Sequence, residues 1–445
     1  MKYLIRNTKI VMATRIVQGS LCLEDGVISC IGEPVGGRSG YTVIDGRGQY
    51  AVPGFIDIHC HGGIGFDLTA GRYDPKKKRF DASIGHYQES LGALMRHFAR
   101  QGVTRVLLST LAAPTKRLEG VLREVAGYMR DGGNGTKSAE LAGAFIEGTF
   151  IKNPDYAGAQ NAAYFQRPSI RLFERLNRAA GGGIRYVNVA PEHGEAARRL
   201  VSHLTERGVL VGAGHTRCSA DTYMRAVDKG LRVAVHFTNG PTGSSFKPFG
   251  GGGVLQSVLT SRRVSAELIA DGYHVNPAYL RDILQRKRPA RIVSVTDAMF
   301  MTGVRGVSSF EVYGIKGRLS GNRKYLQVEG KENTLFGSVL TMPVAFANWV
   351  SYLTREMRGI WFAEHVPYET DDAVHIASRL CAGNPAALLG VLEPASRYLG
   401  QDLSEYGGTL SLGKRADVVL LKLKGKPGNY RAGISAVFIK GRRVR

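Results

Sequence analysis

Cysteine is scarce in this sequence. The five cysteines, Cys22, Cys30, Cys60, Cys218 and Cys381, are scattered over 445 residues, and no Cys-x-x-Cys pair occurs. This pattern argues against a zinc ribbon and against a disulfide framework, so we expect reduced cysteines. The opening residues, MKYLIRNTKIV, are interrupted by lysine and arginine and lack the continuous apolar core of a signal peptide. We therefore expect a cytoplasmic protein.

Long hydrophobic runs are also missing, and acidic residues are fewer than basic ones. No stretch approaches the roughly 20 apolar residues that span a bilayer, which argues against a membrane protein. The 60 lysines and arginines exceed the 37 aspartates and glutamates, giving a formal net charge of +23. Such an excess can mark a nucleic-acid binder, but here the basic residues are scattered without interleaved aromatics. We expect a solvated basic surface without nucleic acid as partner, or, as the functional alternative, attraction of an anionic small molecule.

The chain divides into segments with two different sequence patterns. Runs rich in β-branched residues and broken by glycine turns fill residues 1–52 and 405–445. Between them, eight short apolar runs alternate with helical patterns, as expected for buried parallel strands. These runs are GFIDIH (54–59), TRVLLST (104–110), LAGAFIE (141–147), IRYVNVAPE (184–192), VLVGAGH (209–215), LRVAVHF (231–237), AELIADGYH (266–274) and RIVSVTD (291–297). The sequence predicts an α/β fold, with a (β/α)8 TIM barrel over 53–404 and a small β-sandwich domain built from both termini, 1–52 and 405–445.

Helices are expected between and after these runs. Apolar residues recur at helical spacing over 86–101, 194–207 and 219–229, and Ser219 is a suitable N-cap for the last of these. After the eighth run we expect a hairpin over 307–330, a helix from about 338 and another near 370–392.

Acids and imidazoles follow most of the apolar runs. The first run ends in His59 and His61, and the third, fifth, sixth and eighth end in Glu147, His215, His236 and Asp297. The active site of a (β/α)8 barrel lies at the carboxyl ends of its strands, so these side chains are expected to converge. His59 and His61 lie two residues apart on one strand and therefore share a face.

Nitrogen and oxygen donors of this kind suit zinc or iron better than magnesium or calcium. His59 and His61 can bind one divalent ion, His215 and His236 can bind another, and Glu147 can bridge both or complete one site. Such an ion lowers the pKa of a bound water towards neutrality, and Asp297 would act as general base and then general acid. Taken singly, each of these residues also has an ordinary structural explanation. The set at the strand ends favours a site with one or two metals per subunit.

Motifs along almost the whole chain resemble one family. VPGFIDIHCHGGIG (52–65) looks like the first-strand motif of the amidohydrolase superfamily. Further motifs are similar, in order, to those of the N-acetylglucosamine-6-phosphate deacetylase family. They are FIEGTF (145–150), APE (190–192), GHT (214–216), VHFTNGP (235–241), IADGYHV (269–275), VTDAMFMTG (295–303), GSVLTM (337–342), GNPAALLG (383–390) and GTLSLGKRADVVLL (408–421).

The resemblance implies a hydrolase that removes the acetyl group from an N-acetyl amino-sugar phosphate. It implies Glu147, His215 and His236 as the principal metal ligands, the pair His59/His61 for a second metal, and Asp297 as the catalytic acid and base. The implied substrate contacts are Ala159, Gln160, Asn239, Gly240, Lys247, Asp271, His274, Phe336 and Gly337, with Lys247 and His274 on the phosphate. The family is usually dimeric, so a homodimer with phosphate contacts across the interface is implied.

Several substrate-facing positions depart from the family's pattern. Thr149 stands where a proline is usual, Gln160 where the family has a histidine, and Lys247 where it has an arginine. Lysine lacks the bidentate fork that arginine offers a phosphate. The segment 69–87 also looks longer than expected. The alternative is therefore a related amidohydrolase that deacylates a different, possibly unphosphorylated, N-acyl substrate; a catalytically silent barrel is the non-enzymatic alternative.

Overall fold

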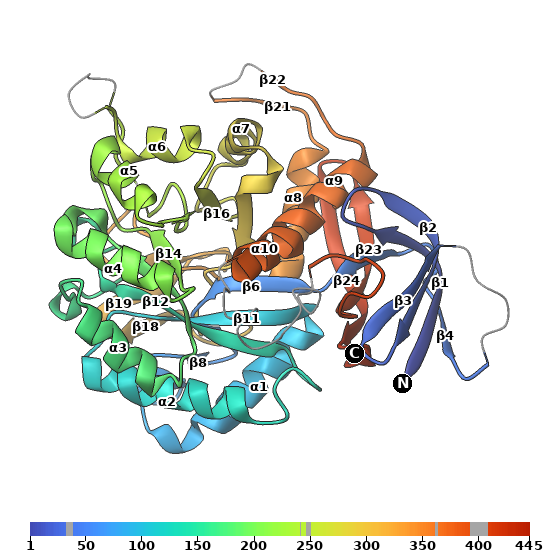
Figure 1. The fold of residues 1–445 in the computed structure, drawn as a ribbon, viewed down its shortest axis with the longest axis horizontal. Coiled ribbons are helices and arrows are strands. Elements are labelled where there is room, and N and C mark those ends of the chain that lie inside the picture. Colours follow the sequence, from blue (N-terminus) through green and yellow to red (C-terminus); the bar gives the residue numbers. More distant parts are fainter. Residues whose placement is uncertain (33–38, 241, 246–250, 361–363, 392–407) are drawn as a thin grey trace.

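The computed structural model describes the whole chain except residues 33–38, 241, 246–250, 361–363 and 392–407. In this described part, one sheet consists of eight parallel strands that follow each other in chain order (Figure 1). The strands are β6 (Phe55–Cys60), β11 (Val103–Thr110), β12 (Glu140–Phe150), β13 (Ile184–Val189), β14 (Leu210–Ala213), β15 (Val233–Ala234), β16 (Ser265–Ile269) and β17 (Ile292–Val295). Each predicted apolar run overlaps one of these strands, so the predicted (β/α)8 barrel is confirmed.

The barrel closes between its first and last strands, just beyond the end of β17. Cys60 and Ala298 form a parallel bridge there. The backbone N–H of Asp297 donates to the carbonyl of His59 at 2.9 Å, and the N–H of His61 donates to the carbonyl of Ala298 at 2.9 Å. The closing hydrogen bonds therefore run through the residues that carry three of the predicted site side chains.

Helices cover the outside of the barrel (Figure 1). They are α1 (Tyr87–Arg100), α2 (Thr115–Arg130), α3 (Ile170–Ala179), α4 (Glu195–Glu206), α5 (Ala220–Asp228), α6 (Val254–Thr260), α7 (Pro277–Lys287), α8 (Met342–Leu353) and α9 (Thr370–Ser378). A further helix, α10 (Asn384–Val391), contributes Ala386 and Leu389 to the same apolar cluster as the strand residues Ile56, Leu210 and Val233. The predicted helices over 86–101, 194–207 and 219–229 are α1, α4 and α5, and the Ser219 hydroxyl accepts the N–H of Thr222 as expected for an N-cap. The single helix expected near 370–392 is α9 and α10 joined by a π-helical turn. None of the described helices has both the length and the apolarity needed to cross a bilayer.

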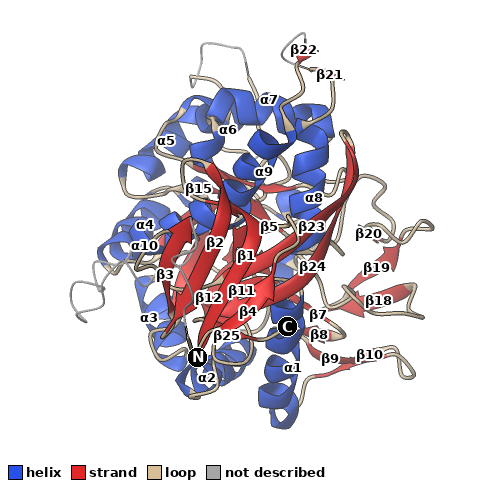
Figure 2. Ribbon diagram, turned by 90° about the vertical axis from the view of Figure 1, so that its right-hand side faces the viewer, coloured by secondary structure: helices blue, strands red, loops and turns tan. Residues whose placement is uncertain are grey.

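Strands from both ends of the chain form a second sheet on one side of the barrel (Figures 1 and 2). They are β1 (Lys2–Val11), β2 (Ile16–Glu24), β3 (Val27–Gly32), β4 (Thr42–Asp45), β5 (Tyr50–Pro53), β23 (Val418–Lys426), β24 (Asn429–Ile439) and β25 (Arg442–Arg443). β5 pairs with β23 in antiparallel register and so joins the N-terminal strands to the C-terminal ones. The small β unit built from both termini is thus confirmed as part of the fold. Its expected boundary at 404/405 lies outside the described residues.

Two inserts pack against each other beside the mouth of the barrel (Figure 2). The first contains β7 (Gly62–Gly63), β8 (Phe66–Asp67), β9 (Gly71–Asp74) and β10 (Arg79–Asp81). The second contains β18 (Ser309–Val312), β19 (Ile315–Leu319) and β20 (Leu326–Val328), so the hairpin expected over 307–330 has a third strand. A chain of edge-to-face rings connects the inserts, from Phe80 through Phe300 and Phe310 to Phe336, with ring centres 4.8–5.1 Å apart. A short pair, β21 (Met357–Arg358) and β22 (Glu364–His365), follows α8.

The expectation that all cysteines are reduced is wrong for one pair. Cys22 on β2 and Cys30 on β3 are joined by a disulfide. They are direct partners in the antiparallel register of these strands, which places them side by side. This pairing depends on strand register, which cysteine count and spacing do not reveal. Cys60, Cys218 and Cys381 are free and buried.

An ion-pair network joins the amino-terminal end of the barrel to the second sheet. Glu140, at the start of β12, lies 3.3 Å from Arg105 on β11 and also pairs with Arg415, which precedes β23. Arg415 makes a further ion pair with Asp417 at 2.9 Å. Burial would raise the pKa of Glu140, but the two guanidinium groups outweigh it and hold that pKa well below its ordinary value of 4.5.

Glu140→Gln is expected to lower the free energy of unfolding by about 2 kcal/mol at pH 7, because it leaves two buried guanidinium groups with less opposing charge. Since the folded-state pKa of Glu140 is depressed, its contribution is complete above pH 4.5 and is lost as the pH falls below it. Urea unfolding at pH 7 and in acid measures the free energy of unfolding of the variant and the wild type. The difference between them should become smaller in acid. Glu195→Gln, which breaks an exposed pair with Arg198, is the matched control. Equal effects of both substitutions at pH 7 would contradict the assignment.

Candidate metal centre and active site

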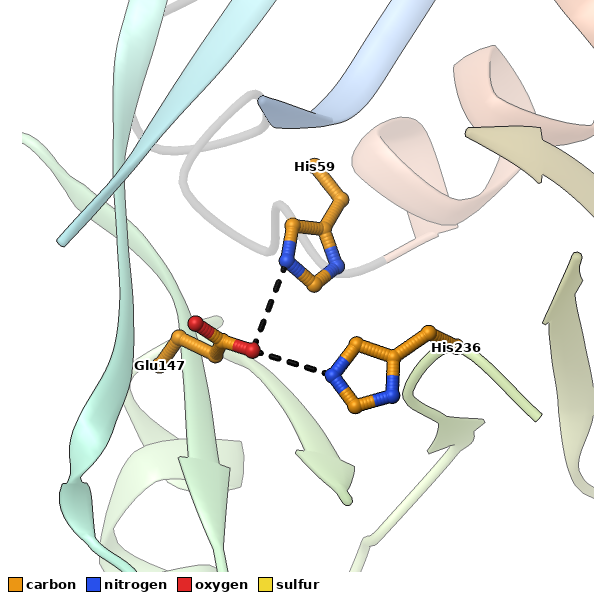
Figure 3. A group of neighbouring side chains, drawn as sticks. All are labelled: His59, Glu147 and His236. Carbon is orange, nitrogen blue, oxygen red and sulfur yellow. Dashed lines mark hydrogen bonds and ion pairs between the residues drawn. The ribbon is translucent and has the colours of Figure 1, made fainter. Parts of the chain in front are cut away.

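The carboxylate of Glu147 lies where several histidines converge at the carboxyl ends of the strands. Figure 3 shows His59 from β6 and His236, which follows β15, pointing towards Glu147 on β12. The Oε1 atom of Glu147 is 3.0 Å from His236 Nε2 and 3.6 Å from His59 Nε2. The Nε2 atom of His215, which follows β14, is 3.2 Å from the same oxygen. One buried oxygen thus faces three imidazoles.

Asp297 completes a second group beside the first. Its Oδ1 atom lies 3.5 Å from His59 Nε2 and 3.3 Å from His61 Nε2. His61 Nε2 is also 3.3 Å from Oε2 of Glu147, so the two groups are contiguous. The structure therefore brings together all six residues that the sequence suggested for metal binding and acid–base chemistry.

The backbone turns sharply at three of these residues. His215, His236 and Asp297 have φ values of 53°, 29° and 50°, in the left-handed region that residues other than glycine rarely adopt. Each of them lies two residues beyond the last residue of its strand, β14, β15 or β17. The turn redirects each side chain into the barrel mouth, and backbone strain of this kind is concentrated at functional sites.

Hydrogen bonds to the Nδ1 atoms fix the orientation of two rings. His59 Nδ1 lies 3.0 Å from Oε2 of Glu267 on β16, and the other oxygen of Glu267 accepts the hydroxyl of Tyr186 at 2.9 Å. His215 Nδ1 lies 2.8 Å from the carbonyl of Tyr156. Because a carbonyl can only accept, Nδ1 of His215 carries a proton, and its Nε2 is available as a donor atom for a cation.

The charges of the site favour a cation at its centre. Burial would lower the pKa of His59, but Asp297, Glu267 and Glu147 outweigh it and raise that pKa to about 9. Burial would raise the pKa of Glu147, but hydrogen bonds from His215, His236 and His61 hold it well below its ordinary value. The buried carboxylates thus remain ionised and attract positive charge, whether from protonated imidazoles or from a metal.

The donor set fits a divalent metal. Ligands about 2.0–2.1 Å from a tetrahedral ion lie about 3.3 Å from each other, and the contacts around Oε1 of Glu147 span 3.0–3.6 Å. The Nε2 atom of His59 is buried and has no hydrogen-bond partner among the described residues. Two overlapping groups could each hold an ion: His59 with Glu147 and His236, and His59 with His61 and Asp297. These are nitrogen and oxygen donors, as zinc and iron sites have.

A cavity of about 500 Å³ opens onto this cluster, which fits a small-molecule site. Of the expected substrate contacts, the cavity is lined by Ala159, Asn239, Gly240, His274, Phe336 and Gly337. Asp271 is not among the described lining residues and instead bonds Nδ1 of His274 at 2.7 Å. Gln160 lies behind Glu147, to which it donates a hydrogen bond. Lys247 lies outside the described residues.

Sequence reasoning missed several residues of the site. Glu267 lies inside a predicted apolar run, and a charged residue at the centre of a buried strand was the signal that could have revealed it. Tyr156 and Lys331 also line the cavity. Neither belongs to a motif, and Lys331 comes from the loop after β20, which reaches the cavity only through tertiary packing.

No family model matches the chain. The N-acetylgalactosamine-6-phosphate deacetylase of Escherichia coli O157:H7 is 30% identical to it over 401 residues, which is 90% of either chain. The N-acetylglucosamine-6-phosphate deacetylase of Vibrio furnissii is 28% identical over 370 residues, covering 83% of this chain and 85% of the relative.

Solved structures share the whole fold. The N-acetyl-D-glucosamine-6-phosphate deacetylase of Mycobacterium smegmatis superposes with a TM-score of 0.79 at 24% identity, over 100% of both chains. The N-acetylglucosamine-6-phosphate deacetylase of Pasteurella multocida gives 0.78 at 20% identity, over 100% of this chain and 99% of the other. The chain belongs to the N-acetylglucosamine-6-phosphate deacetylase family.

Proposed function

We propose that the protein is a metal-dependent hydrolase that removes the acetyl group from N-acetylglucosamine-6-phosphate or a close N-acetyl amino-sugar phosphate. The products are acetate and the amino-sugar phosphate. The observation that carries this proposal is the convergence of His59, His61, Glu147, His236 and Asp297, together with His215, at the cavity. The names of the family relatives support the substrate class.

The metal would be held by the chain's own donors in two adjoining places. Glu147, His215 and His236 would hold the principal ion, which the donor chemistry suggests is zinc or iron. The second group, His59, His61 and Asp297, would hold another. A bound divalent ion polarises the amide carbonyl and makes water a stronger acid.

Asp297 is proposed to move the proton. It lines the cavity, and His59 and His61 lower its pKa against the effect of burial, so it is ionised at rest. A carboxylate at this position can accept a proton from water and then deliver it to the leaving amine. The donated proton prevents the departure of an unstable amide anion.

The walls of the cavity differ in character. Leu111, Met299 and Phe336 line the cavity and belong to one apolar cluster, which suits the acetyl methyl group. His274 and Lys331 also line the cavity, and their side-chain N–H donors suit the sugar phosphate. His274 is oriented by its bond to Asp271, which leaves its Nε2 atom for the substrate.

The galactosamine isomer is a second candidate within this substrate class. The relative at 30% identity acts, by its name, on N-acetylgalactosamine-6-phosphate.

We also propose that the protein is a cytoplasmic homodimer. Its chain would divide into a barrel, 53–404, and a small β domain, 1–52 with 405–445.

Acetate release from metal-loaded protein tests the proposed function. We expect turnover of N-acetylglucosamine-6-phosphate or N-acetylgalactosamine-6-phosphate and much slower turnover of unphosphorylated N-acetylglucosamine. Asp297→Asn should reduce turnover by at least about 100-fold, because proton transfer is lost, while an ion remains at Glu147. Equal rates with and without phosphate would favour the unphosphorylated alternative, and absence of both metal and hydrolysis would favour a silent barrel.

His59→Asn is expected to reduce the metal content from two ions per chain to one, because the second group needs His59, whereas Glu147 keeps His215 and His236 for the principal ion. Elemental analysis of the purified protein measures this. His193→Asn is the matched control, since the His193 ring bonds the carbonyl of Ile151 instead of a site residue. Unchanged metal content in His59→Asn would remove this histidine from the metal site.

Lys331→Ala is expected to raise the KM for the phosphorylated substrate about tenfold, the effect of losing one charge-assisted contact. The kcat should stay the same, because the proposed role of Lys331 is in binding, whereas Asp297 is proposed to transfer the proton. Lys324→Ala removes an exposed lysine from the same insert, not among the described lining residues, and should leave KM unchanged. If both variants behave like the wild type, Lys331 does not contact the phosphate.

A further inference from the structure

Gln160 is buried and makes two short hydrogen bonds next to the metal centre. Its Nε2 atom donates to Oε2 of Glu147 at 2.6 Å, and its Oε1 atom accepts the backbone N–H of Ala112 at 2.7 Å. Gln160 is 6% exposed and is not among the described residues that line the cavity. We propose that Gln160 is a positioning residue for Glu147 that sets the affinity of the centre for its metal, in place of a contact to the substrate.

The hydrogen bonds themselves fix the orientation of the Gln160 amide. The N–H of Ala112 can only donate, so the atom facing it must be the amide oxygen of Gln160. The NH2 group therefore faces Glu147, which accepts because it is ionised. The reversed amide would place two donors against each other at Ala112 and two acceptors against each other at Glu147.

This contact fixes the plane of the Glu147 carboxylate. The last torsion of a glutamate side chain is broad and nearly two-fold, so packing or hydrogen bonds must select the orientation of the carboxylate. Gln160 binds Oε2, and Oε1 is thereby directed at His215 and His236. The backbone carbonyl of Glu147 is held as well, by Nδ2 of Asn188 at 2.9 Å.

The chain is shaped around this contact. Gly148 follows Glu147, and a Cβ atom at this position would lie 2.3 Å from the backbone nitrogen of Ala112 and 2.5 Å from Oε1 of Gln160. Both distances are too short for any side chain. Glycine at 148 thus allows β12 to approach Ala112 and Gln160 closely enough for the hydrogen bonds to form.

The chemistry of an amide suits this role. Its N–H group donates without titrating, so the bond to Glu147 persists over a wide pH range. Residues that orient metal ligands through a single hydrogen bond typically change metal affinity by about 10- to 100-fold when they are removed. The inference rests on the proposed function only in requiring that a metal binds at Glu147.

Gln160→Met and Gln160→Glu test the inference. The first retains the length and removes both the donor to Glu147 and the acceptor for Ala112. The second retains an oxygen for Ala112 but sets a carboxylate against Glu147. Competition with a chelator at pH 8 should show zinc binding weakened about 10- to 100-fold by Gln160→Met and at least as much by Gln160→Glu. Once zinc is saturating, KM should equal the wild-type value, because Gln160 does not contact the substrate.

Gln166→Met is the matched control, a glutamine of the same loop whose side chain bonds only the carbonyl of Tyr164 among the described residues. Unfolding of the metal-free proteins separates folding from metal binding, because it measures the effect of Gln160→Met on stability without zinc. Zinc affinity equal to that of the wild type in both Gln160 variants, with or without a raised KM, would overturn the inference. A wild-type protein that binds no zinc or iron would instead refute the proposed function, and the inference with it.

Discussion

The rest of the site depends on the contacts between the buried carboxylate of Glu147 and the histidines around it. Its two oxygens lie 3.0–3.6 Å from ring nitrogens of His59, His61, His215 and His236. A charge so far from solvent is tolerated only if cations or hydrogen-bond donors surround it. The strands must therefore deliver imidazoles from three places in the barrel to one point. This requirement explains why His215 and His236 adopt an unfavourable backbone conformation just where their strands end.

The residues that close the barrel also form the second half of the site. His59, His61 and Asp297 lie on or just after β6 and β17, the two strands between which the barrel closes. The backbone N–H of Asp297 donates to His59 and that of His61 donates to Ala298, while the three side chains meet inside. Asp57 reinforces the same seam, because its carboxylate accepts the hydroxyl of Thr296 at 2.6 Å. A loosened seam would separate these donors, so the geometry of the second group is set by the closure of the fold.

The barrel strands and the polar residues at their ends could be predicted, because both depend on short stretches of sequence. Buried parallel strands give short apolar runs, and the polar residue that follows a run lies at the barrel mouth whichever strand carries it. What was missed depends on distant parts of the chain. Glu267 orients a histidine that lies 208 positions away, and Lys331 reaches the cavity through an insert. The Cys22–Cys30 bond depends on strand register, and the orientation of Gln160 depends on the backbone of Ala112.

The chain has a net positive charge, but acidic residues are buried at the centre of its site. Overall the protein carries a formal charge of +23, yet Glu147, Glu267 and Asp297 are buried together at the centre of the site. Buried acids attract a cation strongly because little solvent screens them. A basic exterior would act at longer range and would raise the rate at which an anionic molecule encounters the surface. A phosphorylated substrate would thus be drawn by the exterior of the protein, while the acids beneath the cavity would hold the cation of the proposed mechanism.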